Sequence, residues 1–221
     1  GRLLAASPEL LVARTGDRVE STPLAGTTDR HHDPASSLPV ELWSSVKDTA
    51  EHRLVVDAIA ETLGSCTDVL DVPPVPQLVT LRTVTHLATP IQGTLAAGPG
   101  GRLPSVLDLV GALHPTPAVG GVPREAALAC IADLEAAPRG PYAGPVGYVD
   151  GAGDGRWMVG IRAVLAAGRR ARLSAGGGVV AGSVPETELA EVDLKLRSVA
   201  EVLDPSGALL LAAGRAAVPA G

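Results

Sequence analysis

Hydrophobic positions fall into two patterns along the chain, and their alternation predicts the order of helices and strands. Apolar residues recur with the 3.6-residue period of an α-helix over residues 42–63. A shorter helix is predicted over residues 105–113, and another begins at Pro123, a residue type favoured at helix starts. The last helix is predicted over residues 185–203.

Strands are predicted between these helices. Residues 2–22 hold two apolar runs around a Thr-Gly-Asp sequence at 15–17, which is typical of a hairpin. Residues 78–95 are rich in β-branched side chains and indicate extended chain. Proline, glycine and aspartate punctuate residues 23–39, which predicts a loop.

The C-terminal half adds three predicted strands, from the segments GPVGYVD, RWMVGIRAVLAA and RARLSAGGGVVAGS. Helices that alternate with pairs or triplets of strands predict an α+β domain of antiparallel sheets covered by helices. We expect this domain to span residues 1–203, followed by a low-complexity tail over 204–221.

The composition predicts an aliphatic core and argues against nucleic-acid-binding and membrane-spanning proteins. Hydrophobic residues make up 46% of the 221 residues, but phenylalanine is absent and only two Trp and two Tyr occur, so the core must be aliphatic. The net charge is −6 with no basic block, so nucleic-acid binding is not expected. No apolar run approaches the roughly 18–20 residues of a membrane span, so no membrane partner is expected.

The cysteines and the first residues suggest a cellular context. Cys66 and Cys130 lack metal-type spacing and lie in helical patterns, so we expect reduced, buried thiols in a cytoplasmic protein. The chain opens abruptly on an apolar strand and shows no signal-peptide features. We therefore expect it to be the C-terminal part of a longer protein.

Charged residues gather on one side of the last predicted helix. Glu188, Glu191 and Lys195 are spaced three and four residues apart and share a face. The pattern fits a solvated helix with a Glu–Lys pair. It also fits the wall of a binding site, because the glycine-rich stretch before the helix lets a ligand approach backbone N–H groups closely.

A second cluster lies on the first long helix, where Glu51 and His52 stand opposite an apolar face. Alone it reads as surface charge. Together with Glu188 and Glu191, however, Glu51 would form a carboxylate-rich site that suits Mg²⁺. We expect His52 to support or pack against this site rather than bind the metal.

Two charged residues stand in apolar strands. Glu9 either points outward or is buried with a raised pKa, which would suit a general acid. Arg162 either faces water on an edge strand or binds a carboxylate through two hydrogen bonds.

Weaker candidates lie in loops. Gly26 and Thr27 offer backbone and hydroxyl donors. His86 and His114 read as hydrogen-bonded structural groups.

Several longer motifs, in order from residue 3 to about 203, resemble the chorismate-binding enzyme family and most closely its isochorismate synthase branch. They are ASPELLV, PLAGT, KDTAEHRLVVDAI, THLATPIQG, LHPTPAVGGVPREAAL, YAGPVGYVDGAGDGRWMVGIRAVL and RLSAGGGVVAGSVPETELAEVDLKL. The resemblance implies a layered α/β/β/α sandwich of largely antiparallel sheets with chorismate bound between them. It also implies a small-molecule substrate, which we expect a monomer to bind.

The resemblance assigns roles to the charged residues. Glu51 and Glu191 match glutamates that bind Mg²⁺ against the ring carboxylate of chorismate, with Glu188 close by through water. Arg162 matches the arginine that binds the enolpyruvyl carboxylate, and Lys195 matches a lysine that adds a positive contact.

Further positions match the substrate lining and the acid. Gly26, with Thr27 beside it in the same motif, Tyr148 and the backbone around Gly176 match positions that line the substrate. Glu9 matches the general acid that protonates the departing 4-hydroxyl while water adds at ring carbon 2.

One expected group has no match. The general base of the family is a lysine that precedes the SPEL motif, whereas the lysines of this chain, Lys47 and Lys195, match other positions. The chain is therefore expected to bind chorismate poorly and not to hydrate it.

The resemblance as a whole predicts a Mg²⁺-dependent isochorismate synthase, inactive as this chain alone, that serves siderophore, salicylate or menaquinone synthesis. The alternatives are a salicylate synthase, an amine-adding chorismate enzyme and a non-catalytic remnant.

Overall fold

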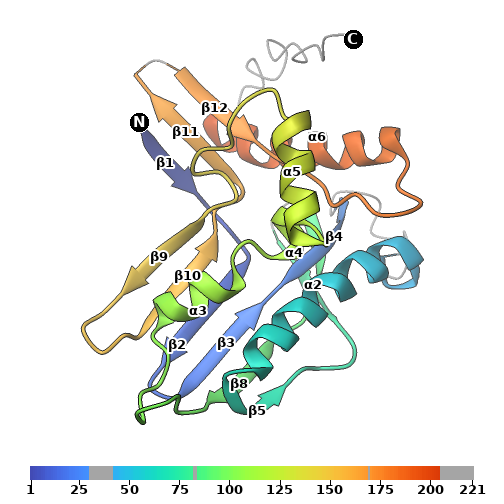
Figure 1. The fold of residues 1–221 in the computed structure, drawn as a ribbon. Coiled ribbons are helices and arrows are strands. Elements are labelled where there is room, and N and C mark those ends of the chain that lie inside the picture. The colour runs from blue at the N-terminus through green and yellow to red at the C-terminus, as the bar shows by residue number, and fades with distance from the viewer. Residues whose placement is uncertain (30–41, 82–83, 169, 205–221) are drawn as a thin grey trace.

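Three antiparallel sheets and the helices that pack on them make up the part of the chain that the structure describes (Figure 1). The structure is a computed structural model that describes residues 1–29, 42–81, 84–168 and 170–204. The strands are β1 (Arg2–Ala5), β2 (Leu10–Thr15), β3 (Arg18–Thr22), β4 (Leu24–Asp29), β5 (Thr67–Asp71), β6 (Gln77–Thr80), β7 (Val84–Ala88), β8 (Ile91–Leu95), β9 (Pro145–Val149), β10 (Gly155–Val159), β11 (Ala163–Ala167) and β12 (Arg170–Ser174). The helices are α2 (Val46–Gly64), α3 (Val106–Leu113), α4 (Pro117–Gly120), α5 (Arg124–Leu134) and α6 (Pro185–Leu203).

The largest sheet has the strand order β5-β8-β3-β2-β10-β9. Helices α2 and α3 cover one of its faces, as Figure 1 shows. The aliphatic core fills the space between them, with Leu11, Val55, Leu63 and Ile91 among its least exposed members. The expected aliphatic core and the α+β arrangement are thus confirmed, since apolar stripes on two helices and the inner face of one sheet bury each other.

Two smaller sheets flank the large one, with strand orders β1-β11-β12 and β4-β7-β6. The chain passes from sheet to sheet over very short links. Pro23 alone separates β3 from β4, residues 89–90 separate β7 from β8, and residues 160–162 separate β10 from β11. These junctions bring backbone and side chains from distant parts of the sequence to the borders between sheets.

The hairpin and most of the helices agree with the sequence prediction. Strands β2 and β3 pair antiparallel around Gly16, whose φ of 63° is the left-handed conformation that glycine adopts readily. Helix α3 begins after Ser105, which caps its first turn together with Asp108. Helix α6 has the bounds that were predicted, and α2 begins four residues later than predicted.

Three predictions about strands were wrong. The predicted loop over residues 23–39 contains strand β4, which pairs with β7; the rest of that segment from residue 30 lies outside the described residues. Strand β5 was not predicted. The single strand predicted over RWMVGIRAVLAA is two strands in different sheets, because Arg162 adopts a φ of 51° and turns the chain.

The expectation of two buried thiols also fails, since Cys130 is exposed and Cys66 is partly buried. In the described ranges, no helix is long and apolar enough to cross a membrane. The predicted tail over 204–221 lies, except for Asp204, outside the described residues.

Candidate functional site

A cavity of about 650 Å³ lies among the strand junctions and the helices. Strands β4 and β7, the segments before β2 and after β12, and helices α2, α4, α5 and α6 all contribute to its wall. One part of the lining, from α4 and α5, is mainly apolar. The other part is charged, and it contains Glu9, Glu51, Arg162 and Lys195.

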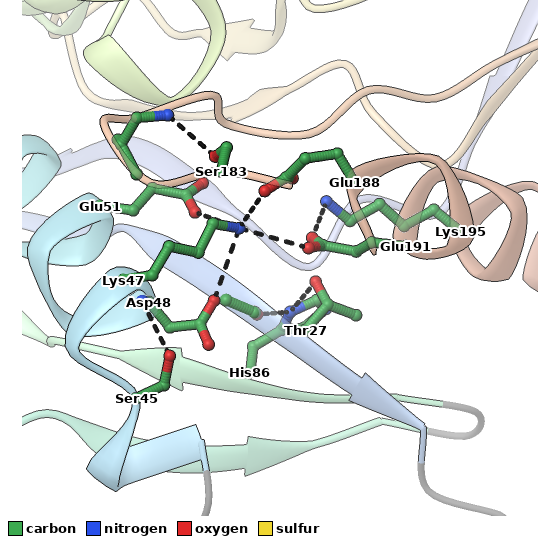
Figure 2. A network of polar contacts seen from close by, with 12 residues as sticks. Thr27, Ser45, Lys47, Asp48, Glu51, His86, Ser183, Glu188, Glu191 and Lys195 are labelled. Carbon is green, nitrogen blue, oxygen red and sulfur yellow. Dashed lines mark hydrogen bonds and ion pairs between the residues drawn. The ribbon is translucent and has the colours of Figure 1, made fainter. Parts of the chain in front are cut away.

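Carboxylates from two helices surround the ammonium group of Lys47 at the charged end (Figure 2). Lys47 Nζ lies 2.8 Å from Glu188 Oε1, 3.7 Å from Glu51 Oε2 and 3.9 Å from Glu191 Oε2. Asp48 Oδ1 is also 3.9 Å away. The sequence prediction that Glu51, Glu188 and Glu191 converge is therefore supported by the geometry, and Lys47 is an addition to it.

Local helix structure explains this convergence. Ser45 caps α2 by accepting a hydrogen bond from the backbone N–H of Asp48, so Lys47 and Glu51 lie in its first two turns. Pro185 occupies the first turn of α6, and the spacing of Glu188 and Glu191 then places both on one face of that helix. The two helix starts meet, and each provides a partial positive charge that favours carboxylates.

Lys195 holds Glu191 from within helix α6. Its ammonium group lies 2.6 Å from Glu191 Oε1 and donates a hydrogen bond of 3.0 Å to the carbonyl of Gly176. Burial alone would raise the pKa of Glu191, but the ammonium groups of Lys195 and Lys47 and a hydrogen bond from Thr27 outweigh it and hold that pKa below its ordinary value. Glu191 is therefore ionised at neutral pH.

Glu51 has the opposite electrostatic balance. Burial raises its pKa to about 7, since the opposing attraction of Lys47 does not outweigh desolvation and the repulsion from Glu191. Lys47 is charged: burial would lower its pKa, but contact with Glu188 and the charges of Glu51 and Glu191 raise it. The cluster is thus rich in negative charge that Lys47 and Lys195 only partly compensate.

The glycine stretch after β12 passes directly over this cluster. A Cβ atom on Gly178 would collide with the carboxylate of Glu51, and one on Gly177 would meet Glu188 Oε2 at 3.3 Å. A Cβ on Gly176 would lie 3.2 Å from the Tyr142 hydroxyl. A side chain at position 178 would therefore displace the Glu51 carboxylate, whereas at 176 and 177 a small shift of the neighbouring group would make room.

The residues present fit a divalent cation. Glu51 Oε2 and both carboxylate oxygens of Glu188 are buried without a hydrogen bond of good geometry, Lys47 meeting Glu188 as an ion pair. Carboxylate oxygens are the ligands that Mg²⁺ prefers. Yet in their present positions no three acidic, histidine or cysteine side chains of the described residues are arranged to hold a metal ion. The donor chemistry fits, while the arrangement is centred on an ammonium group.

Glu9 lines the same cavity from the segment before β2. It is 4% exposed, and burial raises its pKa to about 8. Glu9 is therefore protonated at neutral pH and can donate a proton to a group in the cavity. The alternative that Glu9 points outward is excluded by its burial.

Arg162 is held at the junction between β10 and β11 by His86. The guanidinium donates a 3.0 Å hydrogen bond from Nη2 to His86 Nε2, and His86 Nδ1–H donates in turn to the Gly26 carbonyl at 2.7 Å. This pattern requires a neutral imidazole, and burial together with the Arg162 charge lowers the pKa of His86 to about 4. Arg162 thus faces the cavity with a fixed orientation, and the alternative of a solvent-facing edge residue is excluded.

The remaining predicted residues divide into two groups. Gly26, Thr27 and Gly176 line the cavity. Tyr148 does not: it lies on β9 at the edge of the large sheet and is 65% exposed. The tyrosine that lines the cavity is Tyr142, in the turn before β9, and this corrects the prediction for Tyr148.

The two other histidines singled out from the sequence are structural. His52 Nε2 hydrogen-bonds the buried Thr89 hydroxyl at 2.7 Å, and His52 does not line the cavity. His114 Nε2 bonds the Ala143 carbonyl at 2.9 Å.

Sequence reasoning did not assign Lys47, His86 or Tyr142 to the site. Lys47 stands four residues before Glu51, a spacing that places it on the same helix face and could have indicated their contact. His86 was read as structural, and its link to Arg162 spans strands from two sheets. No sequence pattern around Tyr142 indicated that it would line the cavity.

Comparison with known proteins identifies the family. The model of the chorismate binding enzyme family matches residues 2–204. The chain belongs to the chorismate-binding enzymes. Among curated members of similar sequence, the isochorismate synthase DhbC of Bacillus subtilis (strain 168) is 47% identical over 201 residues, which are 89% of this chain and 49% of that protein.

Solved structures show the same fold. The crystal structure of DhbC from Bacillus anthracis matches with a TM-score of 0.85 at 43% identity, over 91% of this chain and 53% of that one. Anthranilate synthase component I from Streptococcus pneumoniae TIGR4 matches with a TM-score of 0.75 at 32% identity, over 89% of this chain and 43% of that one. The predicted fold class is thereby confirmed, and the chain spans about half the length of the curated relatives it matches.

Proposed function

We propose that this chain forms the substrate-binding and acid-donating part of a Mg²⁺-dependent isochorismate synthase. The reaction adds water at C2 of chorismate, shifts the ring double bonds and expels the C4 hydroxyl, which gives isochorismate. The observation that carries the proposal is the burial of Glu9 in the lining of a cavity where Arg162 and Lys195 suit a dianion. The similarity to isochorismate synthases supports the same reaction.

The two carboxylates of chorismate would be bound at different places. Arg162, oriented by His86, offers a planar pair of donors that suits the enolpyruvyl carboxylate. Lys195 and the backbone around Gly176 also line the cavity and suit a second anionic group. Thr27 and Gly26 border the space between them.

Glu51, Glu188 and Glu191 would hold Mg²⁺. When bound, the ion supplies positive charge that neutralises a ring carboxylate and draws electron density from the ring. The chain contributes the carboxylates, and the glycines at 177 and 178 keep them covered.

Glu9 would act as the general acid. Loss of hydroxide from C4 is slow unless the leaving oxygen is protonated as the bond breaks. A carboxyl with a pKa of about 8 holds its proton at neutral pH and delivers it as the C4–O bond breaks, so that water departs. Burial, which disfavours the charged form, is the physical cause of this capacity.

Activation of the attacking water calls for a base. Both lysines of the chain are charged partners of carboxylates, so neither is placed to accept a proton. We expect this chain alone to bind chorismate weakly and not to hydrate it. A polypeptide extended by the portion of its relatives outside the matched region is expected to do so.

The test is a product assay. The extended polypeptide is incubated with chorismate and Mg²⁺, and the products are separated by liquid chromatography. Isochorismate alone is expected. Salicylate with pyruvate, or an aminated product that requires ammonia or glutamine, would assign the chain to another activity of the family. Absence of turnover in the extended polypeptide would favour a non-catalytic remnant.

A further inference from the structure

Lys47 occupies the centre of the carboxylate cluster, a position that neither the spacing of the acidic residues nor the proposed reaction accounts for. Four carboxylates, on Asp48, Glu51, Glu188 and Glu191, lie within 3.9 Å of its ammonium nitrogen. Each of these distances is short enough for an ion pair, and Figure 2 shows the side chains directed toward the nitrogen. An ammonium group so placed occupies the space in which carboxylates from α2 and α6 would meet a shared cation.

The charges of the cluster favour a second cation. Asp48, Glu51, Glu188 and Glu191 face the ammonium groups of Lys47 and Lys195, so two negative charges remain in excess when all are ionised. A divalent ion would balance this excess. However, a divalent ion and the Lys47 ammonium could not share the centre of the cluster, because like charges at such distances repel strongly.

The two lysines are held differently. Lys195 is anchored by two short contacts, to Glu191 Oε1 at 2.6 Å and to the Gly176 carbonyl at 3.0 Å. Lys47 has one short contact and three longer ones, and its side chain is 23% exposed in the first turn of α2. Lys47 is therefore the cation that can leave toward solvent while Lys195 stays in place.

We propose that Lys47 is an internal counter-cation that fills the carboxylate cluster in the metal-free protein and must withdraw when a divalent cation binds. It keeps Glu51, Glu188 and Glu191 close together without metal, and it weakens metal binding by competing for the same carboxylates. Lys47 is thus a positioning residue that sets the metal concentration at which the site loads. This proposal rests on the metal site of the proposed function.

The test measures metal affinity directly, with Mn²⁺ as the probe. Binding to the full chain is followed by the loss of the electron paramagnetic resonance signal of free Mn²⁺ at fixed pH and ionic strength. Lys47→Met, which removes the charge and keeps the length of the side chain, is expected to lower the dissociation constant by about tenfold or more, because the competing charge is gone. Lys47→Arg, which keeps the charge, is expected to stay within about threefold of the wild type.

Arg53→Met is the matched control. It removes one positive charge from the same helix, at a side chain that is 79% exposed and paired with the exposed Asp57. No change in Mn²⁺ affinity beyond about twofold is expected, since exposed charges are largely screened by salt. A gain equal to that of Lys47→Met would assign the effect to net charge and overturn the proposal.

A second measurement guards against loss of folding. Without metal, Lys47→Met is expected to melt at a lower temperature than the wild type because like-charged carboxylates lose their counter-ion. Added Mg²⁺ is then expected to raise its melting temperature more than that of the wild type. Lys47→Gln, which also removes the charge but remains polar, is expected to behave in the same way.

The outcomes are distinct. Equal or weaker Mn²⁺ binding by folded Lys47→Met and Lys47→Gln would overturn the role of Lys47 and leave the metal site standing. Absence of Mn²⁺ binding in every variant and in the wild type would reject the metal site of the proposed function itself.

Discussion

Replacing Glu9 with glutamine tests whether burial keeps this carboxyl protonated. The pKa of Glu9 is about 8 in the folded protein and 4.5 for the ordinary carboxyl. Between these values the unfolded chain has released its proton while the native protein still holds it, so the stability of the wild type falls as pH rises through this window. A difference of about 3.5 pKa units corresponds to about 5 kcal/mol of unfolding free energy at most.

Glutamine does not titrate, so the stability of the Glu9→Gln variant does not fall in this way as the pH rises. The difference in unfolding free energy between Glu9→Gln and the wild type should therefore grow by about 1.4 kcal/mol per pH unit between about pH 5 and 8. Burying the amide can lower the stability of the variant by an amount that is the same at every pH. Such a cost shifts the plot of the difference against pH but does not change its slope. The assay is urea unfolding followed by circular dichroism at four pH values in that range.

Glu20→Gln provides the control, because Glu20 is an exposed carboxylate on the neighbouring strand β3. The pH slope of the Glu9→Gln difference is read against that of this variant, which makes the same chemical change at an exposed position. If the Glu9→Gln difference does not grow with pH, Glu9 is ionised when folded and the proposed acid is lost. In the extended polypeptide, the same substitution should slow turnover of chorismate by about 10²-fold and leave its binding nearly unchanged.

Three further substitutions give separate tests. Glu191→Ala should weaken Mn²⁺ binding by about 10²-fold or more and abolish Mg²⁺-dependent turnover, since it removes a ligand from a cluster of three; metal dependence that survives would contradict the assignment. Arg162→Lys should raise the KM for chorismate by about tenfold with a smaller change in kcat, because a lysine cannot donate two parallel hydrogen bonds, and an unchanged KM would show that Arg162 does not bind the substrate. Leu63→Ala should lower the unfolding free energy by about 2–5 kcal/mol in urea titrations, since Leu63 is fully buried in the core. Leu134→Ala, at a side chain that is 78% exposed, should stay within about 0.5 kcal/mol, and equal losses would contradict this description of the core.

Local patterns predicted the elements whose structure depends on nearby residues. Helix α6 follows from the apolar and charged periodicity of its own 19 residues, and the β2–β3 hairpin follows from a glycine between two apolar runs. Strand β4 could not be predicted in this way. It contains Gly26 and Asp29 and follows Pro23, residue types that are common in loops, and it becomes a strand because β7, some sixty residues later, pairs with it.

The same distinction applies to the site. Glu51, Glu188 and Glu191 were found because helical spacing and the family motifs both point to them. The boundary between β10 and β11 at Arg162 could not be predicted, because it lies within a largely apolar run. Nothing in the local sequence shows that these two strands belong to different sheets. Tyr148 and Tyr142 lie six residues apart, and only the course of the chain before β9 decides which of them reaches the cavity.

Helix α6 brings two carboxylates and a lysine to the cavity, yet along its length only Ala200 is buried. Its attachment near the cavity therefore depends on Lys47, on the carbonyl of Gly176 and on Thr27 more than on hydrophobic packing. We expect its amide hydrogens to exchange with solvent faster than those of α2, and to slow when metal and substrate fill the cavity. Hydrogen exchange of the α6 amides would then report whether the cavity is occupied. Mass spectrometry can measure this exchange without a label, even in a variant that has no catalytic activity.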